Sequence, residues 1–139
     1  MMTPRDTRTG GVLEAMILPA LRRGGYEYQT QVKIGKRPGG GTHKIDAVAE
    51  KGAERILVSL KWQQVGGTAE QKVPFEVICL AEEIRQQKFH KAYLALGGDG
   101  WTLRDFYTSG GLQAHLIHAD KVQVLTLERF VALANQGKL

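Results

Sequence analysis

Two stretches with strand-like alternation, separated by a four-residue turn, constrain the fold of this chain more than any other feature. Residues 43–50 (HKIDAVAE) and 55–63 (RILVSLKWQ) each combine apolar and polar residues in the pattern of a β-strand. The link Lys51-Gly52-Ala53-Glu54 is short and turn-like, so we expect the two stretches to form an antiparallel hairpin. A hairpin with this much apolar surface requires further strands beside it and helices to cover it.

The rest of the chain supplies those strands and helices. Apolar residues recur at helical spacing in three segments and in one shorter segment, which are 10–23, 70–87, 127–135 and 103–107. Further strands are expected over 26–34, 91–96 and 122–125. This order predicts an α/β fold in which helices flank a central mixed sheet of about five strands. Residues 1–9 have no periodicity, so we expect a loose tail before a single domain over 10–139.

Length and composition agree with one globular domain. The chain has 139 residues, of which 42 % are hydrophobic and 24 % charged. The longest uncharged apolar run, 15–21, is much shorter than a membrane span, and no secretory leader is evident. The single cysteine, Cys79, cannot form an internal disulfide, which suits a reducing compartment. We therefore expect a cytoplasmic or nucleoid-associated protein that is neither secreted nor bound to a membrane.

Positive charge is concentrated in one part of the chain. The net charge is +5, and residues 22–44 contain six basic residues against one acid. A local basic stripe suits a partner that carries phosphate groups, although a solvated surface can have the same composition. The basic side chains closest to the hairpin, and hence the candidates for DNA contacts, are Lys33, Lys36, Arg37 and Lys44.

Polar side chains interrupt one face of the hairpin. Ser59, Lys61 and Gln63 share a face of the second strand, and the turn places Asp46 opposite Ser59 or its neighbour. A carboxylate, a hydroxyl, an ammonium and an amide therefore converge near one end of the hairpin. Carboxylates bind hard cations such as Mg²⁺, and a lysine beside the metal can orient an attacking water molecule. Gln63 is a further candidate for a DNA contact. His43, which follows the glycine-rich loop 35–42 (GKRPGGGT), is expected at the surface.

The segments Lys44-Ile45-Asp46 and Val58-Ser59-Leu60-Lys61 resemble the motif of the PD-(D/E)XK nuclease superfamily. In that superfamily an aspartate ends one strand, and an acid, a variable residue and a lysine follow on the next. The resemblance implies a restriction-endonuclease-like or Holliday-junction-resolvase-like core that hydrolyses DNA with Mg²⁺, or with Mn²⁺ as a substitute. It implies that Asp46 and the backbone carbonyl of Leu60 bind the metal and that Lys61 acts in catalysis.

Resolvase-like members of the superfamily often carry a metal-binding glutamate in the first helix, which implies a role for Glu14. Glu14 lies three and four positions before Ile17 and Leu18, so helical spacing places it on the apolar face. The alternative is an ordinary exposed residue.

Ser59 departs from the motif, because the superfamily has an acid at that position. In some restriction enzymes that carry a serine there, a glutamate of the following helix takes over, and Glu70 and Glu76 are the candidates here. Helical spacing places Glu70 on the same apolar stripe as Val77, near the end of the hairpin, and this favours Glu70. Glu76 becomes the better candidate if Pro74 belongs to the first turn of the helix.

The same helix carries a second resemblance. Gln71-x-x-x-Phe75 resembles the Gln-x-x-x-Tyr motif of RecB-like nucleases, in which the glutamine supports the site through hydrogen bonds. Thr68 to Gln71 equally matches a capping box at the start of a helix. Both interpretations stay open, and Gln71 is carried as a supporting residue together with Glu76.

The leading hypothesis is a metal-dependent DNA endonuclease of homing, restriction, resolvase or repair type. Ser59 is compatible with an alternative, a catalytically inactive module that binds nucleic acid or a protein partner. A third interpretation makes Asp46 and Lys61 a structural ion pair in an α/β interaction domain. A domain of this size cuts one strand at each site, so cutting both strands would require a homodimer or a higher homo-oligomer.

Overall fold

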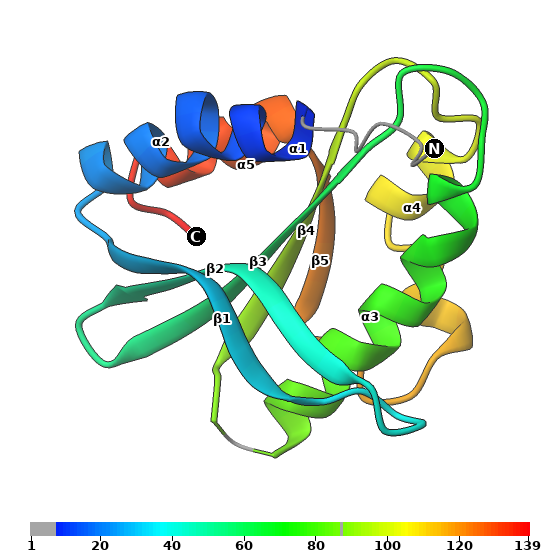
Figure 1. Cartoon of the computed structure of the whole chain (residues 1–139), viewed down its shortest axis with the longest axis horizontal. Helices are drawn as coiled ribbons and strands as arrows, with labels where there is room; N and C mark the ends of the chain where they lie inside the picture. The colour runs from blue at the N-terminus through cyan, green and yellow to red at the C-terminus, as the bar shows by residue number, and fades with distance from the viewer. Residues whose placement is uncertain (1–7, 87) are drawn as a thin grey trace, which may run out of the picture.

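A five-stranded sheet runs through the centre of the molecule, and its strands lie side by side in chain order, β1-β2-β3-β4-β5 (Figure 1). The structure, a computed structural model, describes residues 8–86 and 88–139. The strands are β1 (Glu27–Lys36), β2 (Thr42–Lys51), β3 (Glu54–Trp62), β4 (Lys91–Gly97) and β5 (Val122–Thr126). The helices are α1 (Arg8–Val12), η1 (Leu13–Ile17), α2 (Leu18–Arg23), α3 (Ala69–Arg85), α4 (Arg104–Thr108), η2 (Gln113–His115) and α5 (Leu127–Asn135). The predicted mixed sheet of five strands with flanking helices is confirmed.

Antiparallel and parallel pairing divide the sheet into two parts. β1 pairs with β2, and β2 with β3, in antiparallel fashion, so the predicted hairpin is confirmed. Its turn contains Gly52 at φ 61°, a left-handed conformation that glycine adopts without steric cost. β3, β4 and β5 are parallel, which requires crossover connections. The segment with α3 makes the first crossover, and the segment with α4 and η2 makes the second.

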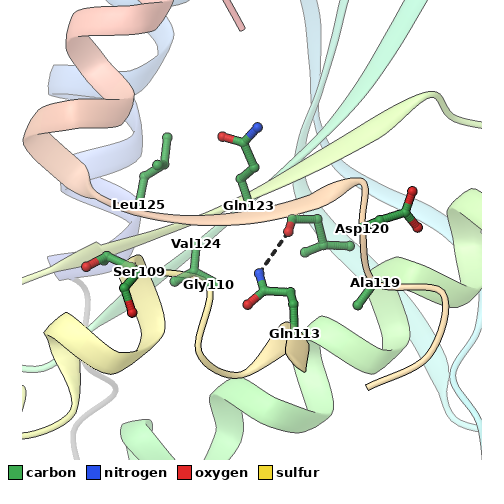
Figure 2. A pocket seen from close by; sticks show the side chains of 10 residues that line it. Ser109, Gly110, Gln113, Ala119, Asp120, Gln123, Val124 and Leu125 are labelled. Atoms are coloured by element: carbon green, nitrogen blue, oxygen red, sulfur yellow. Dashed lines mark hydrogen bonds between the residues drawn. The ribbon is translucent and has the colours of Figure 1, made fainter. Parts of the chain in front are cut away.

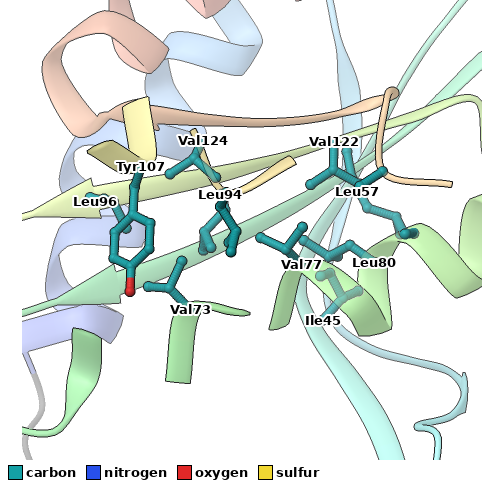
Figure 3. Packing of buried hydrophobic residues seen from close by; sticks show 14 of the residues in the cluster. Ile45, Leu57, Val73, Val77, Leu80, Leu94, Leu96, Tyr107, Val122 and Val124 are labelled. Carbon is teal, nitrogen blue, oxygen red and sulfur yellow. The ribbon is translucent and has the colours of Figure 1, made fainter. Parts of the chain in front are cut away.

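The apolar side chains of the sheet are divided between its two faces. On one face α3 buries Val73, Val77 and Leu80 against Leu57 and Leu94 of the sheet (Figure 3). The opposite face is covered by α1, η1, α2 and α5 (Figure 1), and its core includes Ile17, Leu21, Val58, Tyr93 and Phe130. Each face is thus sealed by its own helical layer, as expected for a sheet with apolar residues on both sides.

The first helical segment begins at Arg8, two residues before the predicted start. Of the expected tail, residues 1–7 lie outside the described part of the chain. The segment contains one π-helical turn, in which the Leu18 N–H donates to the Leu13 carbonyl five residues earlier. Pro19 follows in the first turn of α2, where its missing N–H is tolerated. The segment therefore continues past the proline, although the sequence predicts a kink or an early end there.

α3 runs through Pro74, which cannot donate a hydrogen bond to the carbonyl of Glu70 four residues earlier. The hydroxyl of Tyr107 donates to that carbonyl instead, at 2.8 Å. A side chain of α4 therefore satisfies the acceptor that the proline leaves open. Gln87, the predicted end of this helix, lies outside the described residues. No helix within residues 8–86 and 88–139 is both long and apolar enough to cross a lipid bilayer.

Candidate active site

β2 separates from β3 at Asp46. The paired residues of the two strands end at Ala47 and Val58, and the Leu60 N–H donates to Oδ2 of Asp46 at 2.8 Å. Ile45 and Val48 both belong to the core that faces α3, so the alternation of β2 is broken between them. The side chain of Asp46 thus accepts a hydrogen bond from β3 that a backbone carbonyl of β2 would accept in a regular ladder. The position agrees with the predicted placement of Asp46 beside Ser59.

β1 is distorted at the same level. Thr30 pairs with Ala47 and Val32 with Ile45, which leaves Gln31 opposite Asp46 outside the ladder. Gln31 has φ 54°, a left-handed conformation that is uncommon for a residue with a side chain. β1 and β2 are therefore irregular together, at the point where Asp46 turns towards β3.

Glu76 of α3 is the centre of a polar cluster beneath this point. Its Oε1 lies 3.1 Å from Nε2 of His43 and accepts a hydrogen bond of 3.3 Å from the Ser59 hydroxyl. Its Oε2 lies 3.8 Å from Arg37 and 4.0 Å from Nζ of Lys61. Glu76 as a whole is 6 % exposed. Ser59, which occupies the motif position of an acid, therefore supports an acid that comes from the following helix.

The pKa values of Asp46 and Glu76 are shifted in opposite directions. Burial raises the pKa of Asp46, and this outweighs the Leu60 hydrogen bond and the charge of Lys61, which act to lower it. Burial also acts to raise the pKa of Glu76, but the hydrogen bond from His43 and the charges of Lys61 and Arg37 hold that pKa below its ordinary value. Glu76 is thus the better stabilised anion, and Asp46 lacks enough positive charge around it.

A hard cation suits this donor set. Mg²⁺ is commonly held by one or two carboxylates, with waters and substrate phosphate oxygens as its other ligands. Asp46 and Glu76 supply two such carboxylates, and the raised pKa of Asp46 leaves it in need of a further positive charge. The described residues contain no group of three or more His, Cys, Asp and Glu side chains arranged to hold a metal ion. Any metal bound here would therefore depend on water and substrate for most of its ligands.

A hollow of about 330 Å³ opens beside the cluster, and we call it the cleft. It is lined by Arg37, Lys61, Gln71, Lys72, Phe75 and Glu76. Three of these side chains are cationic, and the one carboxylate lies at the floor. Such a lining suits a ligand that carries negative charge.

Gln71 reaches the cleft from the first turns of α3. Thr68 is the N-cap residue of this helix, but its side chain makes no capping hydrogen bond, so the capping-box interpretation is wrong. The position of Gln71 on the cleft wall is compatible with a supporting role, which stays a prediction.

Glu70 and Gln63 lie in a separate network. The Gln63 amide donates to Glu70 at 3.1 Å and to the Gly100 carbonyl at 2.8 Å. The Glu70 carboxylate also accepts hydrogen bonds from the backbone N–H groups of Thr102 and Leu103. These bonds tie the loop after β3 to the loop after β4 and leave neither side chain directed at Asp46. Glu76 therefore replaces Glu70 as the candidate acid, and Gln63, which is 5 % exposed, is corrected from a DNA contact to a structural residue.

Glu14 is exposed, and its helical segment packs on the face of the sheet opposite α3. The π-helical turn changes the spacing of the segment, so that Leu13 and Ile17 are buried and Glu14 points outward. The prediction that Glu14 shares the apolar face of the segment is therefore wrong. The structure does not join Glu14 to the cluster around Glu76.

The basic residues of the predicted stripe differ in their positions relative to the cleft. Arg37 lines the cleft, whereas Lys33 and Lys44 are paired across β1 and β2 and are both exposed. Lys36 is exposed at the end of β1, beside the turn that leads to β2. Two lysines directly opposite each other repel, so this part of the hairpin would gain from a bound anion.

The sequence predicts His43 at the surface and not in the site, and the structure shows that this prediction is wrong. Its side chain is fully buried and pairs with Glu76, and its Nδ1 has no partner among the described residues. His43 lies two residues before Ile45 on β2, and this spacing is the signal that it faces the core. The sequence also gives no signal for the position of Lys72 in the cleft wall, because exposed lysines are common on helices and this one belongs to no motif.

Two other features lack the chemistry of a nuclease site. A hollow of about 320 Å³ lies between the α4–η2 segment and β5 (Figure 2), and its lining includes Asp120 but no lysine or arginine. Cys79 is buried in α3, and burial raises the pKa of its thiol to about 11, so a nucleophilic thiolate is disfavoured. The cluster around Glu76 remains the candidate site.

Comparisons with known proteins found a family model and a solved structure that match this chain. A family model described as a PD-(D/E)XK nuclease superfamily domain matches residues 5–138. Among solved structures, the crystal structure of a protein of unknown function, AF1548, matches with a TM-score of 0.49 and 14 % sequence identity. The match covers 78 % of this chain and 53 % of that one, so this chain spans about half of its neighbour. No curated protein sequence matches the chain.

Proposed function

Because the chain belongs to the PD-(D/E)XK nuclease superfamily, we propose that it is a metal-dependent endonuclease that hydrolyses phosphodiester bonds in DNA. The observation that supports this most directly is that Lys61 and Glu76 line one cleft, while Asp46 is bonded to the Leu60 N–H beside Lys61 and has its pKa affected by the charges of both residues. Each comes from a different element, β2, β3 and α3, and their side chains are held by hydrogen bonds or ion pairs.

Asp46 and Glu76 would hold Mg²⁺, or Mn²⁺ as a substitute, together with the Leu60 carbonyl that the superfamily motif suggests. The metal would neutralise charge on the phosphate oxygens and lower the pKa of a bound water. Ser59 and His43 keep the Glu76 carboxylate in one orientation through their contacts with Oε1. Lys61 directs its ammonium to the same cleft, where it can donate to a phosphate oxygen and orient the attacking water.

The cations around the cleft provide contacts to the nucleic acid backbone. Arg37 and Lys72 lie at the cleft itself, and Lys33, Lys36 and Lys44 extend positive charge along the β1–β2 hairpin. Contacts of this kind position a phosphate without reading the base sequence. The proposal therefore includes DNA as the partner, and a homo-oligomer if both strands are cut, whether in homing, restriction, resolution or repair.

A cleavage assay tests the proposed function. Labelled single-stranded, duplex and branched DNA would be incubated with Mg²⁺, Mn²⁺ or EDTA, using the wild type, Lys61→Ala and Asp46→Asn. We expect metal-dependent cutting that both substitutions reduce by about a hundredfold or more. Lys121→Ala changes an exposed lysine directly before β5 and outside the cleft; it is the matched control and should cut like the wild type. Equal cutting by the wild type and Lys61→Ala would contradict the proposal.

A catalytically inactive nucleic-acid-binding module is the second candidate. It is favoured by Ser59 at the position of the motif acid and by the cations that already compensate Glu76. This alternative predicts DNA binding that weakens steeply with salt but is insensitive to EDTA, with no cutting of any substrate.

A further inference from the structure

The cleft combines positive charge with one exposed aromatic ring, and we propose that it takes DNA in which the nucleotide beside the scissile phosphate is unpaired. This inference rests on the proposed hydrolysis of DNA and specifies which structural class of DNA the site takes. The ring is that of Phe75, which is 47 % exposed. It lines the cleft together with Lys61 and Glu76.

The fold makes little use of the Phe75 ring. Within the described residues, neither apolar core includes Phe75, either among its buried members or among the side chains packed against it. The neighbours of Phe75 at one helical turn towards the N-terminus are Gln71 and Lys72, both exposed and both in the cleft wall. The ring thus stands among polar groups at the mouth of a charged hollow, where a flat apolar ligand would remove it from water.

The position of Phe75 relative to Glu76 determines what such a ligand would be. Adjacent residues of an α-helix project about 100° apart around its axis, so the carboxylate reaches the floor of the cleft while the ring stays at the rim. A phosphate held at the floor beside Lys61 would carry its sugar and base towards the rim. The ring therefore lies where the base of the bound nucleotide would be.

Paired DNA cannot use this arrangement well. In a duplex both faces of each base are covered by neighbouring base pairs, so no base face is free to stack on the Phe75 ring. An unpaired base has a free face, and stacking on an aromatic side chain is the usual way in which proteins bind single strands without sequence preference. Arg37 and Lys72 supply the positive charge that such a site requires, and Gln71 offers an amide for the edge of the base.

Binding and cleavage of matched DNA molecules test the inference. The full chain would be titrated with dye-labelled oligonucleotides of one length, as a single strand, a forked duplex and a blunt duplex, with Ca²⁺ for binding and Mg²⁺ for cleavage. Phe75→Leu removes the ring but keeps an apolar side chain, and Phe75→Trp keeps a ring. Ile78→Ala is the matched control, because Ile78 is 38 % exposed on the same helix and does not line the cleft.

We expect the wild type to prefer single-stranded and forked DNA, and Phe75→Leu to lose about tenfold or more in affinity for them with little change for the blunt duplex. Phe75→Trp and Ile78→Ala should retain the preference. Equal use of blunt duplex and single strand, with no effect of Phe75→Leu, would overturn the inference even if DNA is cut. A Phe75-dependent preference in binding without metal-dependent cutting would support the inference and overturn the proposed hydrolysis.

Discussion

Oε1 of Glu76 lies 3.1 Å from Nε2 of His43, and the imidazole is completely buried between β2 and α3. Oε1 therefore faces the protein interior, and the other oxygen, Oε2, is left for Lys61 and Arg37 at the cleft. The histidine is thus a positioning residue, since it acts through the carboxylate and does not line the cleft itself.

His43→Ala is expected to lower cleavage by about 10- to 100-fold and to raise the Mg²⁺ concentration needed for half-maximal rate, because Glu76 loses its orientation. His43→Gln, which can donate a hydrogen bond from a similar place, should recover part of the loss. Rates measured over a Mg²⁺ series provide the check, with His115→Ala, an exposed histidine of η2, as the control. An unchanged metal dependence in a folded His43→Ala protein would refute the positioning role.

The raised pKa of Asp46 predicts that Asp46→Asn is more stable than the wild type at neutral pH. A carboxyl whose pKa rises above its ordinary value of 3.8 on folding stabilises the folded state when protonated. That contribution is lost as the pH rises through the folded pKa. Asparagine carries no charge, so it avoids this loss, and it can still accept the Leu60 hydrogen bond. The difference in Tm should therefore shrink as the pH falls through the folded pKa, and it should be smallest below the ordinary value of 3.8.

Glu76→Gln should behave in the opposite way, because the pKa of Glu76 is lowered on folding. Its ionised form stabilises the folded state above the pKa of the unfolded chain, and this stability is lost as the pH falls through the folded pKa. The variant should thus melt below the wild type at neutral pH and approach it in acid. Thermal denaturation over a pH series tests both signs, and a lower Tm for Asp46→Asn at neutral pH would contradict the account of Asp46.

The separation of Glu70 from the cleft predicts different consequences for two glutamates of one helix. Glu70→Ala leaves the buried amide of Gln63 and the part-buried N–H groups of Thr102 and Leu103 without this acceptor, which should cost about 3 kcal/mol of unfolding free energy. Its cleavage rate per folded molecule should remain near that of the wild type. Glu76→Ala should lose about a hundredfold or more in rate. Urea denaturation and single-turnover cleavage separate the two effects, and the reverse pattern would reinstate Glu70 as the metal ligand.

The parts of this molecule that sequence periodicity predicts are those that depend on neighbours along the chain. The hairpin, the order of strands and helices, and the approach of Asp46 to the strand that carries Lys61 all follow from the alternation of two segments and a short turn. The helix that crosses from β3 to β4 is likewise evident from the spacing of Val73, Val77 and Leu80.

The choice between Glu70 and Glu76 depends on contacts between distant segments, which periodicity does not contain. Both glutamates are buried on α3, so burial does not distinguish them. The Glu70 carboxylate accepts hydrogen bonds from backbone N–H groups of the loop after β4, and the positions of these groups depend on how that loop folds back. The prediction that Glu14 lies on the apolar face is wrong for a local reason that periodicity does not contain either. One π-helical turn before Pro19 changes which residues face the sheet.

The left-handed conformation of Gln31 predicts a stabilising substitution beside the site. A non-glycine residue in this conformation destabilises the folded state by about 1–2 kcal/mol. Glycine removes most of this strain, although it loses more backbone entropy on folding. Gln31→Gly should therefore raise the free energy of unfolding by about 0.5–1 kcal/mol. Gln31→Val, which is β-branched, should lose at least as much. Chemical denaturation measures both changes. Destabilisation by Gln31→Gly would show that the side chain is needed for more than its backbone position.

The hydroxyl of Tyr107 and the ring of Pro74 should be energetically coupled, although they lie on different helices. Tyr107→Phe leaves the Glu70 carbonyl without a donor and should cost about 1–2 kcal/mol. In a Pro74→Ala background the new N–H at position 74 can donate to the same carbonyl, so Tyr107→Phe should cost much less. A double-mutant cycle by urea denaturation provides the test. Equal costs in the two backgrounds would show that the proline does not create the need for the tyrosine, and that α4 is held against α3 by its other contacts.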